Sequence, residues 1–341
     1  MEIAVLGLKQ SGKSTLFRIM TGINSAEVYG ESTVPGIAKV PDERFDHLVK
    51  IFNPAKITPA SIPFVDVNAQ GEKGWEDIRN AISHADSLLH IVDCFTASDV
   101  QDMIKRYKML ESELIISDLM IVEKRIERLA KIPANTLKPD ETIQLKILPG
   151  IKEHLEAGKP LRELSFANDE LHAIKNFAFW SLRPELVVLN ISEGASDPSN
   201  EFQSCTKSPV IAICCNIEAE VAQLDAHERE EFLKSLGIET PAFEKIVQTA
   251  FHQLGRIYYF TVGEDEVRAW IVKEGSTAPQ AAAVIHKDFE RGFIKAEVVS
   301  YDDFIACGET LANAKSKGKQ RLEGKEYIVK DGDIISFRFN V

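Results

Sequence analysis

The chain of 341 residues lacks several features that would place it outside the cell or in a membrane. Its five cysteines include no C-x-x-C pair, so neither a disulfide framework nor a cysteine metal site is expected. No apolar run reaches the roughly 18 residues that a membrane-spanning helix needs, and no signal-peptide pattern precedes the first apolar run. A net charge of −12 argues against a generally basic nucleic-acid coat. We therefore expect a cytoplasmic protein with reduced thiols and no membrane attachment.

A phosphate-binding motif stands near the start of the sequence. Residues 7–14 read G-L-K-Q-S-G-K-S, a full match to G-x-x-x-x-G-K-[ST], and they join an apolar run to a helix-like segment. Glycines in such a loop let consecutive N–H groups point at phosphates, and the following helix adds its positive end. Lys13 is expected to reach the β- and γ-phosphates and to act in catalysis, and Ser14 to bind magnesium. The predicted nucleotide-binding residues here are Gly7, Leu8, Lys9, Gln10, Ser11, Gly12, Lys13, Ser14 and Thr15.

The pattern of apolar residues divides the chain into four stretches. Short apolar runs alternate with helical segments in residues 1–96 and 184–257, which predicts one doubly wound, parallel α/β sheet. Between them, residues 97–183 carry apolar residues three and four apart, which predicts a helical coiled-coil insertion of two long antiparallel helices and a shorter one around residues 168–181. Residues 258–341 alternate apolar and polar residues around a helix predicted over residues 279–289, and their size and order fit a ubiquitin-like grasp.

A second magnesium-binding position is predicted at the end of an apolar strand. Asp66 closes the run Ile62–Val65, where P-loop enzymes place a carboxylate that holds magnesium through water. A threonine that completes the metal shell in the presence of a γ-phosphate is also expected. Thr33 is the candidate and Ser32 the alternative, and a buried or capping role for Thr33 stays open.

Base recognition is expected near residue 190. Guanine-specific proteins use N-K-x-D, whereas this chain has Asn190-Ile191-Ser192-Glu193, without the lysine and with a longer acid. The guanine-binding pattern is therefore not reproduced, and the hypothesis is relaxed or adenine-preferring recognition. A further apolar run, Val210–Cys215, is expected to place a loop beside the base. The predicted base-site residues are Asn190, Ile191, Glu193, Cys215 and Asn216.

Basic residues cluster near the end of the chain. They are Lys315, Lys317, Lys319, Arg321 and Lys325. Such a run is either a solvated face or a surface that contacts RNA phosphates.

Together these motifs resemble the Obg-like ATPases, the YchF-type branch of the Obg-related P-loop proteins. The resemblance rests on the phosphate loop, the N-x-x-E segment, the helical insertion and a C-terminal segment that includes I-H-K-D-F-E-R-G-F-I at 285–294. It covers essentially the whole chain. It implies a C-terminal TGS domain, slow magnesium-dependent hydrolysis of ATP in preference to GTP, and association with the ribosome or ribosomal RNA, without DNA sequence specificity.

Three departures from the family pattern concern catalysis. Gln10 replaces an asparagine that is tied to potassium binding in related proteins, so potassium activation stays open. Ala69 stands where the switch motif D-x-x-G has its glycine, and Gln70 falls where many GTPases hold a water-orienting glutamine. Gln70 is the catalytic candidate, but an exposed loop residue is the favoured interpretation, because the surrounding switch is altered. The segment around Thr33 is also shorter than in the family.

Two functions remain. The first is a slow ATPase or GTPase that acts as a switch on RNA or the ribosome. The alternative is a nucleotide-binding adaptor with negligible hydrolysis, because the altered switch regions retain binding without catalysis. A small-molecule kinase is a weaker third idea, since it leaves the insertion and the terminal domain unexplained.

Overall fold

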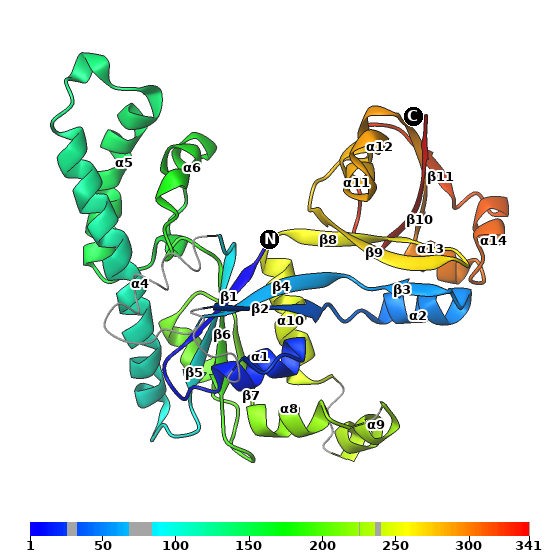
Figure 1. The fold of residues 1–341 in the computed structure, drawn as a ribbon, viewed down its shortest axis with the longest axis horizontal. Helices are drawn as coiled ribbons and strands as arrows, with labels where there is room; N and C mark the ends of the chain where they lie inside the picture. The colour runs from blue at the N-terminus through cyan, green and yellow to red at the C-terminus, as the bar shows by residue number, and fades with distance from the viewer. Residues whose placement is uncertain (26–32, 68–83, 225, 236–239, 341) are drawn as a thin grey trace. The chain divides into compact units, whose positions relative to one another are not determined.

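The structure is a computed structural model, and it describes residues 1–25, 33–67, 84–224, 226–235 and 240–340. Contacts within the chain define two compact units (Figure 1). The first comprises Met1–Gly36 and Pro63–Ile246, and the second comprises Ile37–Ile62 and Val247–Val341. This division is coarser than the four predicted domains, whose boundaries stay predictions.

A six-stranded sheet with the order β2-β4-β1-β5-β6-β7 runs through the first unit. Its strands are β1 (Ile3–Gly7), β2 (Thr33–Lys39), β4 (Ser61–Val67), β5 (Ser87–Asp93), β6 (Glu185–Asn190) and β7 (Val210–Ile213). Strand β1 pairs in parallel with β4 and β5, and β6 lies in parallel between β5 and β7. Residues 186–189 are fully buried, as expected for a parallel strand covered on both faces. The predicted parallel α/β sheet is confirmed for β4, β1, β5, β6 and β7.

The carboxyl ends of the central strands meet at one edge of this sheet. Asp93 pairs in register with Asn190, Gly7 with Ile91, and Val5 with Asp66. In open α/β sheets ligands bind at this edge, because loops and helix N-termini converge there. The edge therefore brings together predicted residues that are far apart in the sequence.

The helices of the first unit include a long hairpin. The helices are α1 (Lys13–Thr21), α4 (Val100–Leu129), α5 (Pro139–Glu156), α6 (Asn168–Ile174), α7 (Ser199–Phe202), α8 (Cys215–Val221), α9 (Ala226–Ser235) and α10 (Ala242–Gln253), the last extending into the second unit. Helix α4 begins after Asp99, whose carboxylate accepts from the Asp102 N–H and satisfies an otherwise unpaired donor. Helices α4 and α5 bury Val122, Leu148 and Ile151 between them.

Two predicted elements in this unit end earlier than expected. The helix expected over 168–181 stops at Ile174, because a single 3₁₀ turn follows and Ala178 takes a left-handed backbone (φ 49°). The strand expected over Val210–Cys215 stops at Ile213, and Cys215 instead begins α8. Its N–H is turned away from the sheet ladder toward the Asn190 side chain.

The second unit contains another six-stranded sheet, with the order β11-β10-β12-β8-β9-β3. The strands are β3 (Lys56–Thr58), β8 (Arg256–Thr261), β9 (Glu266–Lys273), β10 (Phe293–Ser300), β11 (Arg321–Glu323) and β12 (Asp333–Phe339). The helices are α2 (Glu43–Phe52), α11 (Ala278–Ile285), α12 (Lys287–Arg291), α13 (Tyr301–Ala306) and α14 (Leu311–Ser316). The helix predicted over 279–289 is interrupted at His286, whose extended backbone and ring cap α12.

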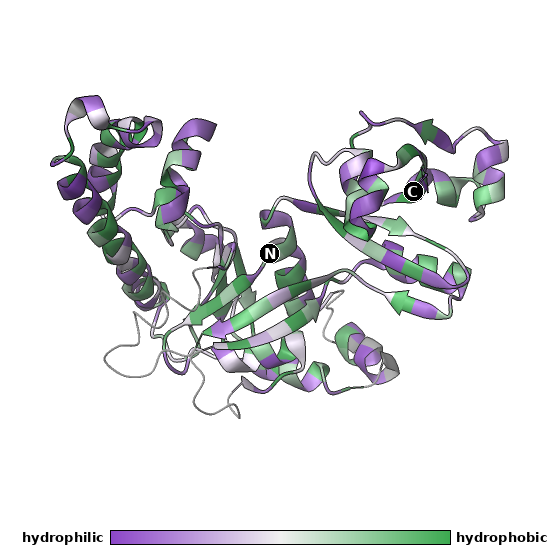
Figure 2. Ribbon diagram, turned by 45° about the horizontal axis from the view of Figure 1, so that its top comes forward, coloured by the Kyte–Doolittle hydropathy of each residue, from purple (hydrophilic) through white to green (hydrophobic). Residues whose placement is uncertain are grey.

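Hydrophobic residues concentrate in the strands and on the inner faces of the helices, with hydrophilic residues outside (Figure 2). In the second unit, Ala278, Ala281 and Ala282 are fully buried and pack α11 on its sheet. Among the described residues, no helix combines the length and the apolar character needed to cross a bilayer.

Candidate nucleotide site

The phosphate loop has the backbone geometry that its glycines predict. Gly12 precedes α1 with φ 91°, a left-handed conformation that side chains disfavour. A Cβ at Gly12 would lie 2.2 Å from Asn190 Nδ2, and one at Gly7 would lie 2.5 Å from Ser11 Oγ. Both positions therefore require glycine. The loop leads directly into the positive end of α1, as anion binding requires.

Two side chains of the loop contact Asp66. Lys13 Nζ forms an ion pair with Asp66 Oδ1, and Ser14 Oγ donates to Asp66 Oδ2 at 3.2 Å. Asp66 is fully buried, and Lys13 is mostly buried beside it. Burial lowers the pKa of Lys13, and the charge of Asp66 opposes that shift. Three of the residues that the sequence predicts for phosphate and magnesium binding, Lys13, Ser14 and Asp66, are thus in direct contact.

The oxygen donors at this position fit magnesium. A serine hydroxyl and a carboxylate are the hard ligands that magnesium prefers, and magnesium commonly keeps several waters beside them. Ser11, in the middle of the loop, adds a fully buried hydroxyl with no hydrogen-bond partner among the described residues. Ser11 Oγ is thus a buried polar atom without a partner in the segment that is expected to surround the phosphates.

Asn190 connects the phosphate loop with the loop after β7. Its Nδ2 donates to the Ser11 carbonyl oxygen at 3.0 Å, and its Oδ1 accepts from the Cys215 N–H at 3.1 Å. The side chain is only 5% exposed, so both bonds form away from water. Asn190 therefore holds two segments of the site at a fixed spacing, a role beyond the predicted contact with the base.

A cavity of about 190 Å³ opens next to Asn190. It is lined by Thr15, Phe95, Asn190, Ile191, Ser192, Glu193, Cys215 and Asn216. The structure thus brings all five predicted base-site residues together. Burial raises the pKa of the Cys215 thiol to about 12, so this side chain is neutral.

Two residues near the site escaped the sequence analysis. Phe95, after β5, contributes an aromatic wall to the cavity, and its carbonyl accepts from Ser192 Oγ at 3.3 Å. Ser25, after α1, is 1% exposed and donates from Oγ to Asp66 Oδ2 at 2.5 Å. Neither belongs to a motif, and only the convergence of strand ends at one edge could have suggested them.

Of the switch candidates, only Thr33 lies within the described residues. Thr33 begins β2, and β2 lies next to β4 in the sheet. The Val40 N–H, just after β2, donates to the Ala60 carbonyl, just before β4, so the two strands run antiparallel and Thr33 lies toward the Asp66 end. Ser32, Ala69 and Gln70 lie outside the described residues.

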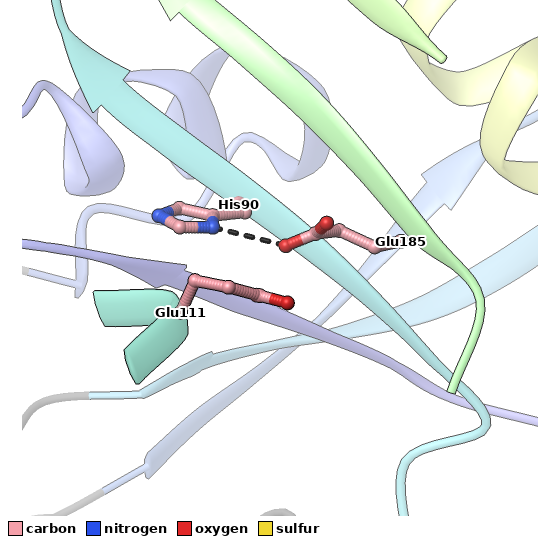
Figure 3. A group of neighbouring side chains, drawn as sticks. All are labelled: His90, Glu111 and Glu185. Carbon is pink, nitrogen blue, oxygen red and sulfur yellow. Dashed lines mark hydrogen bonds and ion pairs between the residues drawn. The ribbon is translucent and has the colours of Figure 1, made fainter. Parts of the chain in front are cut away.

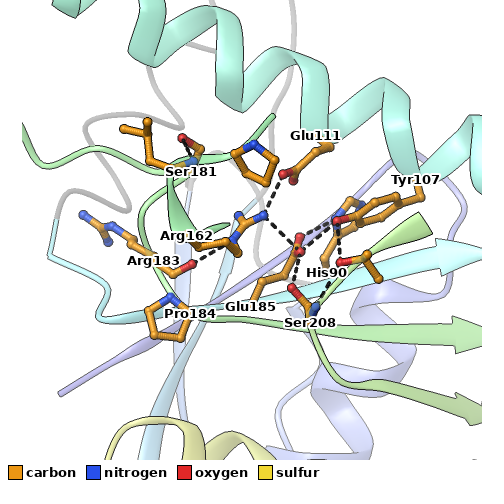
Figure 4. A network of polar contacts seen from close by, with 12 residues as sticks. His90, Tyr107, Glu111, Arg162, Ser181, Arg183, Pro184, Glu185 and Ser208 are labelled. Atoms are coloured by element: carbon orange, nitrogen blue, oxygen red, sulfur yellow. Dashed lines mark hydrogen bonds and ion pairs between the residues drawn. The ribbon is translucent and has the colours of Figure 1, made fainter. Parts of the chain in front are cut away.

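A second polar group, absent from the sequence predictions, is buried where α4 covers the sheet (Figures 3 and 4). Glu185 accepts from His90 Nδ1 at 3.0 Å, from the Tyr107 hydroxyl at 2.9 Å and from Ser208 Oγ at 3.1 Å. Arg162 Nη1 lies 2.6 Å from Glu111 Oε1 and 3.2 Å from Glu185 Oε2. We call His90, Tyr107, Glu111, Arg162 and Glu185 the buried charge cluster.

The two carboxylates of this cluster have opposite environments. Burial raises the pKa of Glu111 to about 7, aided by the charge of Glu185, and Glu111 Oε2 has no partner among the described residues. Burial alone would also raise the pKa of Glu185, but Arg162 and then His90 lower it to about 2. Glu185 is therefore ionised, and Glu111 is the group that holds a proton near neutral pH.

The cluster is better explained by its arginine than by a metal ion. Ligand atoms of His90, Glu111 and Glu185 lie within 4.8 Å of one another, a spacing found in metal sites. However, the Arg162 guanidinium contacts both carboxylates and already supplies the positive charge. A divalent cation beside it would be repelled.

The predicted basic cluster in the second unit is partly neutralised. Lys319 pairs with Asp303 at 2.9 Å, and Arg321 pairs with Glu323 at 2.9 Å. Lys317 instead donates to the Cys307 carbonyl at 3.4 Å, and no carboxylate among the described residues pairs with it. Lys315 and Lys325 are exposed.

Known proteins resemble this chain over its whole length. Residues 256–340 match the family model YchF-GTPase_C, described as a protein of unknown function (DUF933). The "Ribosome-binding ATPase YchF" of Bacillus subtilis (strain 168) is 38% identical over 363 residues, covering 99% of this chain and 98% of that protein. The protein of the same name from Haemophilus ducreyi is 40% identical over 364 residues, covering 100% and 99%. The solved Schizosaccharomyces pombe YchF GTPase superposes with a TM-score of 0.85 at 27% identity, covering 99% of this chain and 97% of its own.

Proposed function

Because the chain belongs to the YchF family of P-loop proteins, we propose that it is a slow, magnesium-dependent ATPase that binds the ribosome. One observation carries the enzymatic half of the proposal: Lys13, Ser14 and Asp66 are in direct contact at the carboxyl edge of the sheet. A P-loop enzyme needs this set to hold the phosphates and their metal ion.

The phosphate loop and the residues beside it then divide the binding of phosphate and magnesium between them. Backbone N–H groups of residues 7–14 and the N-terminus of α1 bind the β-phosphate, and Lys13 turns from Asp66 to the β- and γ-phosphates. Ser14 holds magnesium directly and Asp66 through water, with Thr33 as the proposed third ligand. A magnesium ion held by these residues would supply positive charge that offsets the negative charge developing on the phosphates during hydrolysis. Potassium activation stays open, because Gln10 replaces the family asparagine.

The base binds in the cavity beside Asn190. Adenine presents an amino donor, and the Glu193 carboxylate on the cavity wall is a suitable acceptor. Guanine would need an aspartate placed to accept two donors at once, and this chain lacks the N-K-x-D pattern. Preference for ATP over GTP follows from this difference.

Ribosome binding is assigned to the second unit, whose C-terminal part we propose to be a TGS domain. Two relatives are named ribosome-binding ATPases, and the basic residues near α14 supply charge that can contact RNA phosphates. No base-specific contact to DNA is proposed, and the proposed location is the cytoplasm.

The alternative function is a nucleotide-binding adaptor without turnover. It is favoured by one feature of the sequence, because Ala69 stands where the family's switch motif has its glycine. Binding and hydrolysis therefore have to be measured separately.

The test is calorimetric titration with ATP and GTP in the presence of magnesium, followed by single-turnover hydrolysis of the tighter ligand. We expect tighter ATP binding and slow hydrolysis that Lys13→Ala abolishes. Tight binding without Lys13-dependent hydrolysis would support the adaptor. Unchanged affinity in Lys13→Ala would reject the site itself.

A further inference from the structure

Asp66 receives three donors, and two of them have other tasks once a nucleotide is bound. Its Oδ1 accepts from Lys13, and its Oδ2 accepts from Ser14 at 3.2 Å and from Ser25 at 2.5 Å. Under the proposed function, Lys13 moves to the phosphates and Ser14 to the metal ion. Ser25 alone has no phosphate or metal assigned to it, so it can keep its bond to the carboxylate.

The acceptor of the Ser25 hydroxyl also differs from those of two other hydroxyls in the same unit. Thr21 Oγ1 donates to the Phe17 carbonyl of its own helix at 2.7 Å, and Ser87 Oγ donates to the Pro184 carbonyl at 2.9 Å. Both of these acceptors are neutral backbone groups. Ser25, by contrast, donates to a fully buried carboxylate, where a hydrogen bond to a charged acceptor is stronger than one between neutral groups.

We propose that Ser25 is a positioning residue for magnesium, which orients Asp66 by holding Oδ2 so that Oδ1 can accept from metal-bound water. This inference rests on the proposed function, because it takes Asp66 as the carboxylate that holds magnesium. Ser25 itself touches neither metal nor phosphate. Its effect is exerted through the rotamer of Asp66.

The bond also connects two parts of the site. Ser25 lies after α1, at the end of a segment that begins in the phosphate loop, whereas Asp66 lies on β4. Fixing the carboxylate to this segment places the metal-holding group relative to Ser14, which lies in α1. Loss of a partner of this kind usually weakens metal affinity about 10- to 100-fold.

The experiment measures ATP affinity across a magnesium titration for the full-length protein and for Ser25→Ala, Ser25→Thr and Asp66→Asn. We expect Ser25→Ala to raise the half-saturating magnesium concentration about 10-fold or more. ATP affinity without magnesium should change less than about 2-fold, and Ser25→Thr, which keeps the hydroxyl, should restore the magnesium response. A merely structural role for Ser25 would alter binding with and without magnesium alike.

Two further variants control for packing. Ser87→Ala removes an equally buried hydroxyl at the start of β5, and we expect it to leave the magnesium response unchanged. Ser25→Cys fills the same space with a weak donor, and it replaces Ser25→Ala if that variant does not fold.

The outcomes separate this inference from the proposed function. If Asp66→Asn shifts the magnesium response and neither Ser25→Ala nor Ser25→Cys does, the positioning role of Ser25 is wrong while the magnesium site stands. If Asp66→Asn causes no shift, the placement of magnesium is wrong and the inference falls with it.

Discussion

The nucleotide site and the buried charge cluster lie on the same strands but are built in opposite ways. Strand β5 carries His90 within the cluster and ends at Asp93, and β6 begins with Glu185 of the cluster and ends at Asn190 of the nucleotide site. The phosphate loop consists of consecutive residues and relies on backbone N–H groups. The cluster collects side chains from β5, α4, the turn at Leu161–Glu163 and β6.

The two sites differ in how far their polar groups are satisfied within the protein. At the nucleotide site, polar groups such as Ser11 Oγ keep bonding capacity that a ligand can use. In the cluster, the charges satisfy one another within the protein, and only Glu111 Oε2 and Arg162 Nη2 remain unpaired among the described atoms. We therefore expect substitutions in the cluster to act mainly on stability and substitutions at the loop edge to act mainly on binding.

The largest effect is expected from Arg162→Ala. This change leaves two carboxylates buried without their cation, which should lower the free energy of unfolding by about 3 to 5 kcal/mol. Urea denaturation measures the decrease. The control is Lys152→Ala, which removes exposed pairs with Glu123 and Glu156 and should lower the stability far less. Equal costs in the two variants would mean that the cluster is not desolvated as described.

Asn190→Ala should lower both the stability of the protein and its affinity for ATP. It removes the partners of the Ser11 carbonyl and the Cys215 N–H, so we expect a decrease of about 3 kcal/mol in stability and about 10-fold in ATP affinity. Denaturation and calorimetry measure the two effects. Ser192→Ala, on the rim of the same cavity, is the control and should change each only slightly. A variant with normal affinity would contradict the bracing role of Asn190.

Glu111→Gln should change how stability depends on pH. The pKa of Glu111 is raised from 4.5 to about 7, so its stabilising effect is complete below pH 4.5 and declines as the pH rises toward 7. The amide cannot titrate, and the variant should lack this decline, which is on the order of 2 kcal/mol between about pH 5 and about pH 7.5. Urea denaturation of Glu111→Gln and of the unsubstituted protein at both pH values measures this decline.

Glu185 does not contribute to the change in stability between about pH 5 and about pH 7.5. Its pKa is lowered from 4.5 to about 2, so its contribution is present above pH 4.5 and declines only as the pH falls toward 2. If Glu111→Gln and the unsubstituted protein became less stable by the same amount over that rise in pH, the titrating proton would have to be placed elsewhere.

The smallest effect per residue is expected at the exposed charges of the second unit. Replacing Lys315, Lys317 and Lys325 with glutamine should flatten the plot of log affinity for RNA or the ribosome against log salt concentration. The expected change in slope is about 0.7 to 0.9 for each phosphate that is no longer neutralised. The double change of Lys319 and Arg321 should have less effect, since both already pair with carboxylates. Binding measured from low to high salt distinguishes the two sets, and identical slopes would reject the assignment.

Local sequence patterns predicted much of the fold and the loop. The motif at residues 7–14 and the apolar runs of β4, β5 and β6 specified elements whose residues are adjacent in the chain, so periodicity and turn chemistry were sufficient. The early end of the strand at Ile213 was missed, because the Cys215 N–H bonds to a side chain 25 residues earlier.

The sequence by itself determined the phosphate loop, the strands of the α/β sheet and the helices of the hairpin, since each of these elements depends mainly on residues that are near neighbours in the chain. Only the tertiary structure decided that Ser25 contacts Asp66, that Asn190 braces two loops, and that Glu111 shares a buried arginine with Glu185. The reason is physical: hydrogen bonds and charges act over a few ångströms, and chain folding alone determines which distant residues come within that range.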